Sequence, residues 1–174
     1  LEELGAQVTV LELNWDFAEM GAAVGRIFAA EGYSFYGHLL HDAELPIDED
    51  VKKRLLPGRD LSAADYLKAL RERDKIKQRA NAQLETFDAL LTPTTLTAAP
   101  VVEYIDQTQS PAWFTRATNL LDRCAVCLPN GFSPAGLPLS LQIMCQGHHE
   151  SMALRIAWAY QNVTQWHRRR PTLS

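Results

Sequence analysis

Residues 119–143 read NLLDRCAVCLPNGFSPAGLPLSLQI, and this stretch decides the fold. It holds two apolar runs separated by the turn-forming residues 130–136. A shorter apolar run, residues 89–91, comes earlier and ends at a Thr-Pro pair. Runs of this kind, bounded by Pro and Gly, are typical of strands that are buried on both faces of a sheet. The sequence therefore predicts strands at residues 89–91, 124–128 and 137–145.

Helical periodicity surrounds these strands and predicts an α/β fold in which helices cover a sheet. The expected helices lie at residues 15–30, 47–56, 63–87, 112–121 and 151–167. Ser62 is expected to cap the longest of them, because Asp65 three residues later completes a shorter version of the capping box.

The connecting segments have other patterns. Residues 7–13 are rich in β-branched side chains and partly alternate, so a strand is expected there, and Asn14 is expected to cap the helix that follows. Residues 32–46 are expected to form an irregular loop. Residues 92–100 follow a predicted buried strand, where α/β proteins often build ligand sites, although a rigid connector fits the same composition. Residues 101–111 are expected to be an exposed excursion.

The composition is that of one globular domain. The chain has 174 residues, of which 47% are apolar and 22% are charged. Its net charge of -4 offers no electrostatic attraction to nucleic acid or to an anionic membrane. No apolar run approaches the ~20 residues that cross a bilayer. The three cysteines, an odd number, argue against a disulfide framework and favour a cytoplasmic protein. The chain starts at Leu1 inside what reads as the last turn of a helix, so we expect it to be a piece of a longer protein.

Two patterns are similar to metal sites. Cys124, Cys127, Cys145 and His148 have the spacing of a zinc ribbon. The first pair lies in a predicted strand, where positions three apart point to opposite faces, so buried cysteines that act as small apolar residues are favoured. His38 and His41 are close enough in sequence to share a metal, but no third ligand is fixed by the sequence.

The serines offer no recognisable nucleophile. None of them lies in a glycine-rich elbow that would expose its hydroxyl, and Ser140, inside an apolar strand, is expected to be a packing residue. The residues alone therefore assign no catalytic residue, no metal and no cofactor.

An ordered set of motifs resembles the amidase signature family, serine hydrolases that cleave carboxamides. The matching runs are VKKRLLPG at 51–58, DYLKA at 65–69, DALLTPT at 88–94, Asn119-Leu120 preceded by Thr115 or Thr118, PNGF at 129–132, and GLPLSLQI at 136–143. Each run is short, but together they cover nearly the whole chain in the family's order.

The resemblance implies acyl transfer by a Ser-Ser-Lys mechanism on a small-molecule amide. The glycine- and serine-rich signature that carries this chemistry does not lie in residues 1–174, so no catalytic residue is carried over. The chain is expected to be a single C-terminal segment of the family's mixed β-sheet domain, with the N-terminal half of that domain as its partner and a second copy as a candidate dimer partner. Arg54 matches a position where amidotransferase A subunits bind a substrate carboxylate. With Thr92 and Thr94 of the pocket-wall loop, it completes the set of expected substrate-binding residues.

Two departures from the family pattern bear on the substrate. Ala112 stands where the amidotransferase A subunits carry an acid, and Leu121-Asp122 and Cys124-Ala125 stand where the family has a glycine and a Pro-Ala pair. The resulting Asn-Leu-Leu-Asp run resembles the branch that contains allophanate hydrolases and assorted bacterial amidases, which favours a general amidase. The alternative is a non-catalytic binding or interaction module built on the same half-fold.

Overall fold

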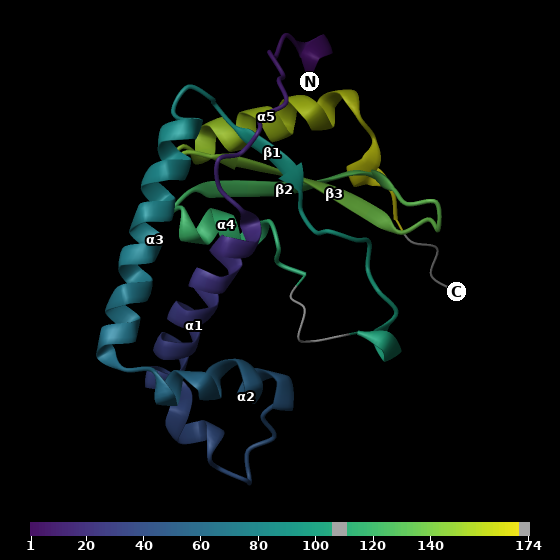
Figure 1. Ribbon diagram of the computed structural model, residues 1–174. Helices are drawn as coiled ribbons and strands as arrows, with labels where there is room; N and C mark the ends of the chain where they lie inside the picture. The colour runs from purple at the N-terminus through teal and green to yellow at the C-terminus, as the bar shows by residue number, and fades with distance from the viewer. Residues whose placement is uncertain (106–110, 171–174) are drawn as a thin grey trace.

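The computed structural model describes residues 1–105 and 111–170 (Figure 1). Its elements are, in chain order, η1 Glu2–Leu4, α1 Phe17–Leu40, α2 Glu49–Leu55, η2 Leu56–Asp60, α3 Ala63–Leu84, β1 Leu90–Pro93, η3 Val102–Tyr104, α4 Thr115–Leu120, β2 Cys124–Phe132, β3 Pro138–Cys145, α5 Glu150–Val163 and η4 Trp166–Arg168. Of the excursion predicted at residues 101–111, residues 106–110 lie outside the described part. No helix in the described ranges is both long enough and apolar enough to cross a membrane.

The three strands form one antiparallel sheet in the order β1-β3-β2. β2 and β3 make a hairpin whose register pairs Cys124 with Cys145 at one end and Phe132 with Pro138 at the other. The β3 strand therefore has a hydrogen-bonded neighbour on each edge. The α/β class is confirmed, and within the described residues its sheet is wholly antiparallel.

Helices cover both faces of this sheet (Figure 1). On one face, Ile143 and Cys145 of β3 pack with Leu128 against Ala153 and Ala157 of α5. On the other face, Met144 belongs to a core cluster with side chains of α1, α3 and α4, among them Met20, Ile76, Ala80 and Ala117. The second half of β3, residues 142–145, is thus buried on both faces, as its apolar run predicts, whereas Pro138 and Leu139 at its start are exposed. β2 is not buried on both faces, because most of its residues outside Leu128 remain exposed or half-buried.

The predicted cap of the longest helix is confirmed. Ser62 Oγ accepts a hydrogen bond from the Asp65 backbone N–H at 3.1 Å, and Asp65 Oδ2 accepts one from the Ser62 backbone N–H at 3.2 Å. These bonds satisfy two of the orphan donors at the start of α3. The Ser62 hydroxyl also donates to Asp65 Oδ2 at 2.6 Å, and this bond, together with the one from the Ser62 backbone N–H, holds the pKa of Asp65 below its usual range.

The loop predicted at residues 32–46 is wrong over its first half, because α1 continues through it to Leu40. Asp16, not Asn14, caps this helix by accepting from the Ala18 N–H at 2.8 Å. The glycines suggest a loop because they lower helix propensity. In the structure Gly32 instead makes room for Leu55 of α2, so tertiary packing overrides propensity here.

The strand predicted at residues 7–13 is also wrong for the described part of the chain. These residues lie in the run before α1 that contains no strand (Figure 1). No described strand lies beside them to accept or donate ladder hydrogen bonds.

Alanine substitutions at two glycines should separate close packing from helix propensity. A Cβ atom at Gly58 would lie 1.9 Å from the Ala29 carbonyl oxygen, so Gly58→Ala should lower the free energy of unfolding by roughly 3 kcal/mol or more. The matched control is Gly25→Ala in the middle of α1, where a Cβ meets nothing within 4 Å. The free energy of unfolding of that variant should rise by about 0.5–1 kcal/mol. Urea denaturation followed by circular dichroism measures both, and equal stabilities would contradict the close packing of η2 on α1.

Candidate functional site

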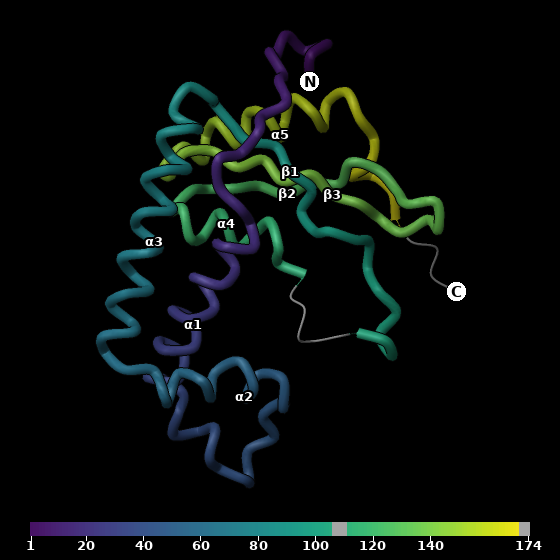
Figure 2. Tube along the Cα trace, in the orientation of Figure 1, coloured from purple at the N-terminus to yellow at the C-terminus, as the bar shows by residue number. Residues whose placement is uncertain are grey.

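A hollow of about 440 Å³ opens where β1 ends beside β3. It is lined by Leu91, Thr92, Pro93, Thr95, Leu96, Thr97, Ala98, Asn130, Leu139, Ser140 and Leu141. Figure 2 shows the teal segment that supplies most of these residues leaving β1 and running away from the sheet toward η3. The wall predicted from residues 92–100 is therefore one side of an actual depression, and the start of β3 is the other.

Hydrogen bonds fix the start of this wall to the sheet. The buried Gln142 donates from Nε2 to Thr92 Oγ1 at 3.1 Å, and the Thr94 N–H donates to the Ser140 carbonyl at 3.1 Å. Beyond the strand, Thr95 Oγ1 donates to the Thr97 carbonyl at 2.8 Å and closes a local turn. The segment is thus held in a defined conformation even though it has no helical or strand period.

Hydroxyl groups provide the polar chemistry of the hollow. Thr92 Oγ1 accepts from Gln142 and keeps its own proton to donate. Thr94 is not one of the residues that line the hollow, and its Oγ1 is buried without a hydrogen-bond partner in the described part of the chain. The side chains that line the hollow include no acid, base or thiol, so among described residues the site can bind a neutral polar group but has no base to activate a nucleophile.

Of the three predicted substrate-binding residues, Thr92 lines the hollow. Thr94 lies two residues further on, where its N–H bonds to Ser140 of β3, and it is not part of the lining. Arg54 is an exposed residue in the last turn of α2. Figure 1 places α2 at the far end of α1 from the sheet, and α2 contributes nothing to the lining of the hollow.

The sequence predicts no site role for two polar residues of the hollow. Ser140, expected to be a packing residue of its strand, is half-buried, lines the hollow and accepts from Thr94 through its carbonyl. Asn130 lies in β2 and reaches the same hollow. These residues lie opposite the segment after β1 because of strand pairing, and the pairing cannot be predicted from any single segment of the sequence.

The zinc-ribbon spacing does not produce a cluster. Cys124 faces Cys145 across the hairpin, whereas Cys127 pairs with Gln142 and is exposed. No group of three His, Cys, Asp or Glu residues that could hold a metal occurs in the described ranges. Burial raises the pKa of Cys145 to about 11, so this thiol is a poor metal ligand at neutral pH. The expectation that all the cysteines are buried is wrong for Cys127.

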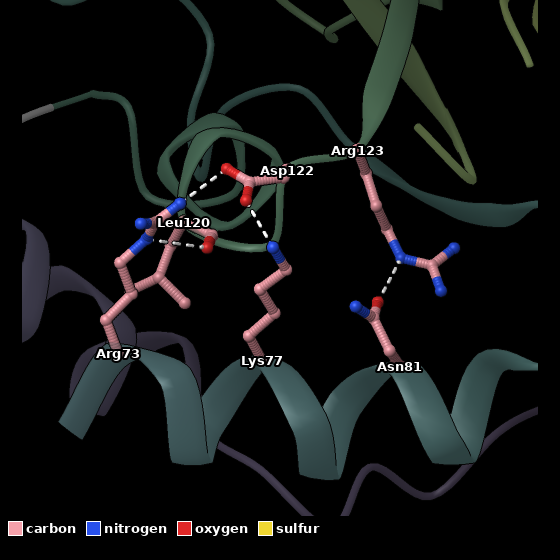
Figure 3. Close-up of polar contacts among 6 residues, drawn as sticks. All are labelled: Arg73, Lys77, Asn81, Leu120, Asp122 and Arg123. Carbon is pink, nitrogen blue, oxygen red and sulfur yellow. Dashed lines mark hydrogen bonds and ion pairs between the residues drawn. The ribbon is translucent and has the colours of Figure 1, made fainter. Parts of the chain in front are cut away.

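A second polar cluster joins α3 to the turn between α4 and β2 (Figure 3). Asp122 accepts from Arg73 and from Lys77, and Arg73 Nε also donates to the Leu120 carbonyl at 3.3 Å. The hydrogen bond from Lys77, aided by the charge of Arg73, holds the pKa of Asp122 below its usual range. One turn along α3, Arg123 Nε donates to Asn81 Oδ1 at 2.9 Å.

The backbone explains why this cluster is structural. Asp122 has a φ of 52°, in the left-handed region that few side chains tolerate but Asp and Asn do. Its carbonyl oxygen lies so close to Gly147 that a Cβ there would come within 2.4 Å. The cations of α3 thus hold a strained turn against the end of β3. Because its acceptor oxygens are engaged by Arg73 and Lys77, Asp122 is a poor candidate for a general base.

The comparisons with known proteins agree on one family. The family model described as Amidase matches residues 7–154. The A subunit of the glutamyl-tRNA(Gln) amidotransferase of Synechococcus elongatus is 35% identical over 163 residues, covering 79% of this chain and 33% of that protein. The corresponding A subunit from Geotalea daltonii is 34% identical over 160 residues, covering 79% and 33%. The chain thus spans about a third of the length of these curated relatives.

Solved structures show the same fold at lower identity. An allophanate hydrolase from Kluyveromyces lactis superposes with a TM-score of 0.84 at 24% identity, covering 99% of this chain and 30% of that one. A structure titled as that of an amidase gives a TM-score of 0.82 at 20% identity, covering 92% of this chain and 38% of that one. Each of these neighbours is much longer than the 174-residue chain.

Three variants of Asp122 should separate its charge from its backbone conformation. Asp122→Asn keeps tolerance of the left-handed region and should cost up to about 1 kcal/mol, because the side chain is half-exposed and its ion pairs are screened by solvent. Asp122→Ala should cost roughly 1–2 kcal/mol more, since alanine is strained at positive φ. The free energy of unfolding of Asp122→Gly should be close to that of Asp122→Asn. Urea unfolding gives all three values.

The charge contribution should depend on pH. Because the folded-state pKa of Asp122 is lowered, its stabilisation is present above the unfolded pKa of about 4 and disappears as the pH falls through the folded value. The stability difference between the parent chain and Asp122→Asn should therefore be constant at neutral pH and shrink in acid. A difference that grew on acidification would contradict the ion-pair assignment.

Proposed function

The chain belongs to the amidase family, and we propose that it forms the C-terminal part of an enzyme that hydrolyses carboxamide C–N bonds. Its 174 residues supply core strands and one wall of the substrate pocket. A serine nucleophile, a second serine and a lysine base belong to the part of the domain outside this chain. The whole enzyme is proposed to act in the cytoplasm, without a cofactor.

The observation that carries this proposal is the hollow beside β1 together with the family match that spans it. An amide substrate offers a carbonyl oxygen that accepts hydrogen bonds and an N–H that donates them. Thr92 lines the hollow, accepts from Gln142 and retains a hydroxyl proton to donate to that carbonyl. Leu91, Leu96 and Leu141 provide apolar wall for the rest of the acyl group. These groups are suited to binding and orienting an amide beside a nucleophile supplied from elsewhere.

In the proposed enzyme, the residues that make and break bonds belong to the part of the domain outside this chain. The serine oxygen attacks the amide carbon, the amine leaves with a proton, and water releases the acid from the acyl-enzyme. The contribution of the described residues is to hold the acyl portion still and to exclude water from one side of it. The alternative, a non-catalytic module on the same half-fold, predicts ligand binding without turnover.

A second candidate function is glutamine-dependent amide transfer. It is favoured by the names of the relatives at 34–35% identity, which are amidotransferase A subunits. Recognition of glutamine requires an acid for its α-amine, and Ala112 occupies the position where the sequence pattern places that acid. Arg54 keeps the group proposed for the α-carboxylate. We therefore favour a general amidase.

Activity should depend on the whole domain. The 174-residue chain alone should release no ammonia from hexanamide, benzamide or glutamine, because no nucleophile with a base lines its hollow. The longer polypeptide that carries the rest of the domain should hydrolyse the two neutral amides faster than glutamine. Ammonia release with and without a sulfonyl fluoride measures this. Inhibitor-sensitive turnover by the short chain would refute the division of labour, and an inactive longer polypeptide would refute the amidase function.

Substitutions at the proposed binding residues should change KM for different classes of amide. In the longer polypeptide, Leu96→Trp should raise KM for neutral amides about tenfold with little change in kcat, because a larger side chain fills the hollow. Leu67→Trp is the matched control, an exposed leucine on α3 outside the lining, and should leave KM unchanged. Arg54→Ala should raise KM only for amides that bear a carboxylate. A KM that is insensitive to Leu96→Trp would remove the hollow from the substrate pocket.

A further inference from the structure

Two cysteines face each other at the open end of the β2–β3 hairpin. Cys124 is the first residue of β2 and Cys145 is the last residue of β3, and the register pairs them directly. The Thr94 N–H donates to the Ser140 carbonyl, so the backbone of every second residue of β3 from Ser140 onward points toward β1. Cys145 falls on the alternate positions, whose backbone points toward β2. A hydrogen-bonded pair of this kind has Cα atoms about 5.5 Å apart, a separation that a disulfide can span.

The thiols of Cys124 and Cys145 lie on the same face of the sheet. Cys145 belongs to the core cluster against α5, and Cys124 packs against that cluster. The Cys124 thiol donates to the Gln146 carbonyl at 3.2 Å, so its sulfur already reaches across the hairpin to the residue that follows Cys145. Cys127 stands opposite Gln142, three positions along β2, and its side chain points to the other face. Of the three cysteines, Cys124 and Cys145 are thus the two that can approach each other.

The ends of the two strands allow this approach. A disulfide at a hydrogen-bonded position needs the two Cβ atoms to move together by roughly 1 Å. Both cysteines stand where the ladder stops, so the movement disturbs few ladder hydrogen bonds. The backbone beyond them is also in close contact, because a Cβ at Gly147 would lie 2.4 Å from the Asp122 carbonyl oxygen. Cys124 is half-buried and Cys145 is fully buried, so a reagent in solution meets Cys124 first.

We propose that Cys124 and Cys145 form a redox-sensitive dithiol that a small-molecule disulfide closes into a cross-strand disulfide bond. In the first step, the Cys124 thiolate attacks one sulfur of the small disulfide, whose S–S bond breaks and whose other half leaves and takes up a proton. In the second step, Cys145 gives its proton to water, its thiolate attacks Cys124 Sγ, and the second small thiol leaves. The protein dithiol loses two electrons and two protons, and the small disulfide gains them.

This dithiol is separate from the hollow. The residues of β2 and β3 that line the hollow are Asn130 and residues 139–141, which lie toward the other end of the hairpin. A bridge between Cys124 and Cys145 instead ties the turn at Asp122 to the end of β3. Both thiols and their surroundings belong to this chain, so the inference does not rest on the proposed function, and either can fail without the other.

Glutathione disulfide tests the bridge in the longer polypeptide. The substitution Cys127→Ser leaves two thiols in the tryptic peptide of residues 124–155, which follows Arg123 and ends at Arg155. After native treatment with glutathione disulfide, then denaturation with an alkylating reagent, this peptide should lack the mass of two hydrogen atoms and carry no alkyl group. Dithiothreitol should restore both thiols. Two alkylated thiols, a glutathione adduct on Cys124 that does not close, or a cross-link to another peptide would overturn the proposal.

Single substitutions separate the two steps. Cys145→Ala should stop the reaction at a glutathione adduct on Cys124. Cys124→Ser replaces a half-buried side chain by one of similar size, so it tests the order of the steps even if Cys145→Ala fails to fold. In this variant the fully buried Cys145 should remain a thiol. Modification of Cys145 in Cys124→Ser as fast as modification of Cys124 in the parent would contradict entry through Cys124.

The second step should depend on pH. Burial raises the pKa of Cys145 to about 11, so its thiolate fraction rises about tenfold per pH unit near neutral pH. Because only the thiolate attacks, closing of the mixed disulfide on Cys124 should accelerate by about the same factor per unit. Release of glutathione from the purified mixed disulfide measures this rate. A closing rate that does not change with pH would refute attack by Cys145.

Discussion

The structure depends on the burial of residues 142–145, the second half of β3, on both faces of the sheet. Ile143, Met144 and Cys145 are fully buried, and their side chains alternate between a cluster with α5 and a cluster with α1, α3 and α4. Both edges of the strand are hydrogen-bonded as well, to β1 and to β2. A strand with four occupied sides cannot slip by one residue without moving every side chain into the wrong layer. The register of β3 therefore fixes where the segment after β1 begins, and hence where the hollow lies.

The parts of the fold that follow from the sequence are those with local causes. Ser62 and Asp65 make the predicted capping box because its bonds close within one turn. The apolar run of β3 predicts burial on both faces correctly for residues 142–145 and wrongly for Leu137 and Leu139, which are exposed. The loop predicted at residues 32–46 fails because Gly32 serves contact with Leu55, a residue of another helix, and the sequence of α1 carries no sign of that contact. The strand predicted at residues 7–13 has the right local preference, but a strand exists only with a neighbour to bond.

The candidate site likewise contains residues that the local sequence predicts and residues that it does not. The loop of Thr92 and Thr94 is predictable from its place after a buried strand, and the structure puts a hollow there. Ser140 and Asn130 reach the hollow only through the antiparallel pairing of β3 with its two neighbours, which no single segment encodes. Arg54 comes from a motif resemblance alone, and such a match gives a position in the chain without a distance to the site. Placement on α2 leaves its role in substrate binding dependent on the rest of the domain.

The two departures from the family pattern, at Asp122 and at Ala112, have different consequences for the chemistry of the enzyme. Asp122 stands at a position of positive φ, where glycine would carry no strain, and it offsets the strain with bonds from Arg73 and Lys77. Arg73 and Lys77 both belong to α3, so the replacement of glycine by aspartate is compensated within this chain. The replacement therefore need not change which ligand the enzyme binds. Ala112 differs in kind, because a methyl group cannot bind an amine wherever the surrounding backbone places it. The choice between a glutamine-specific enzyme and a general amidase therefore rests on position 112, and the Asn-Leu-Leu-Asp run carries little weight in it.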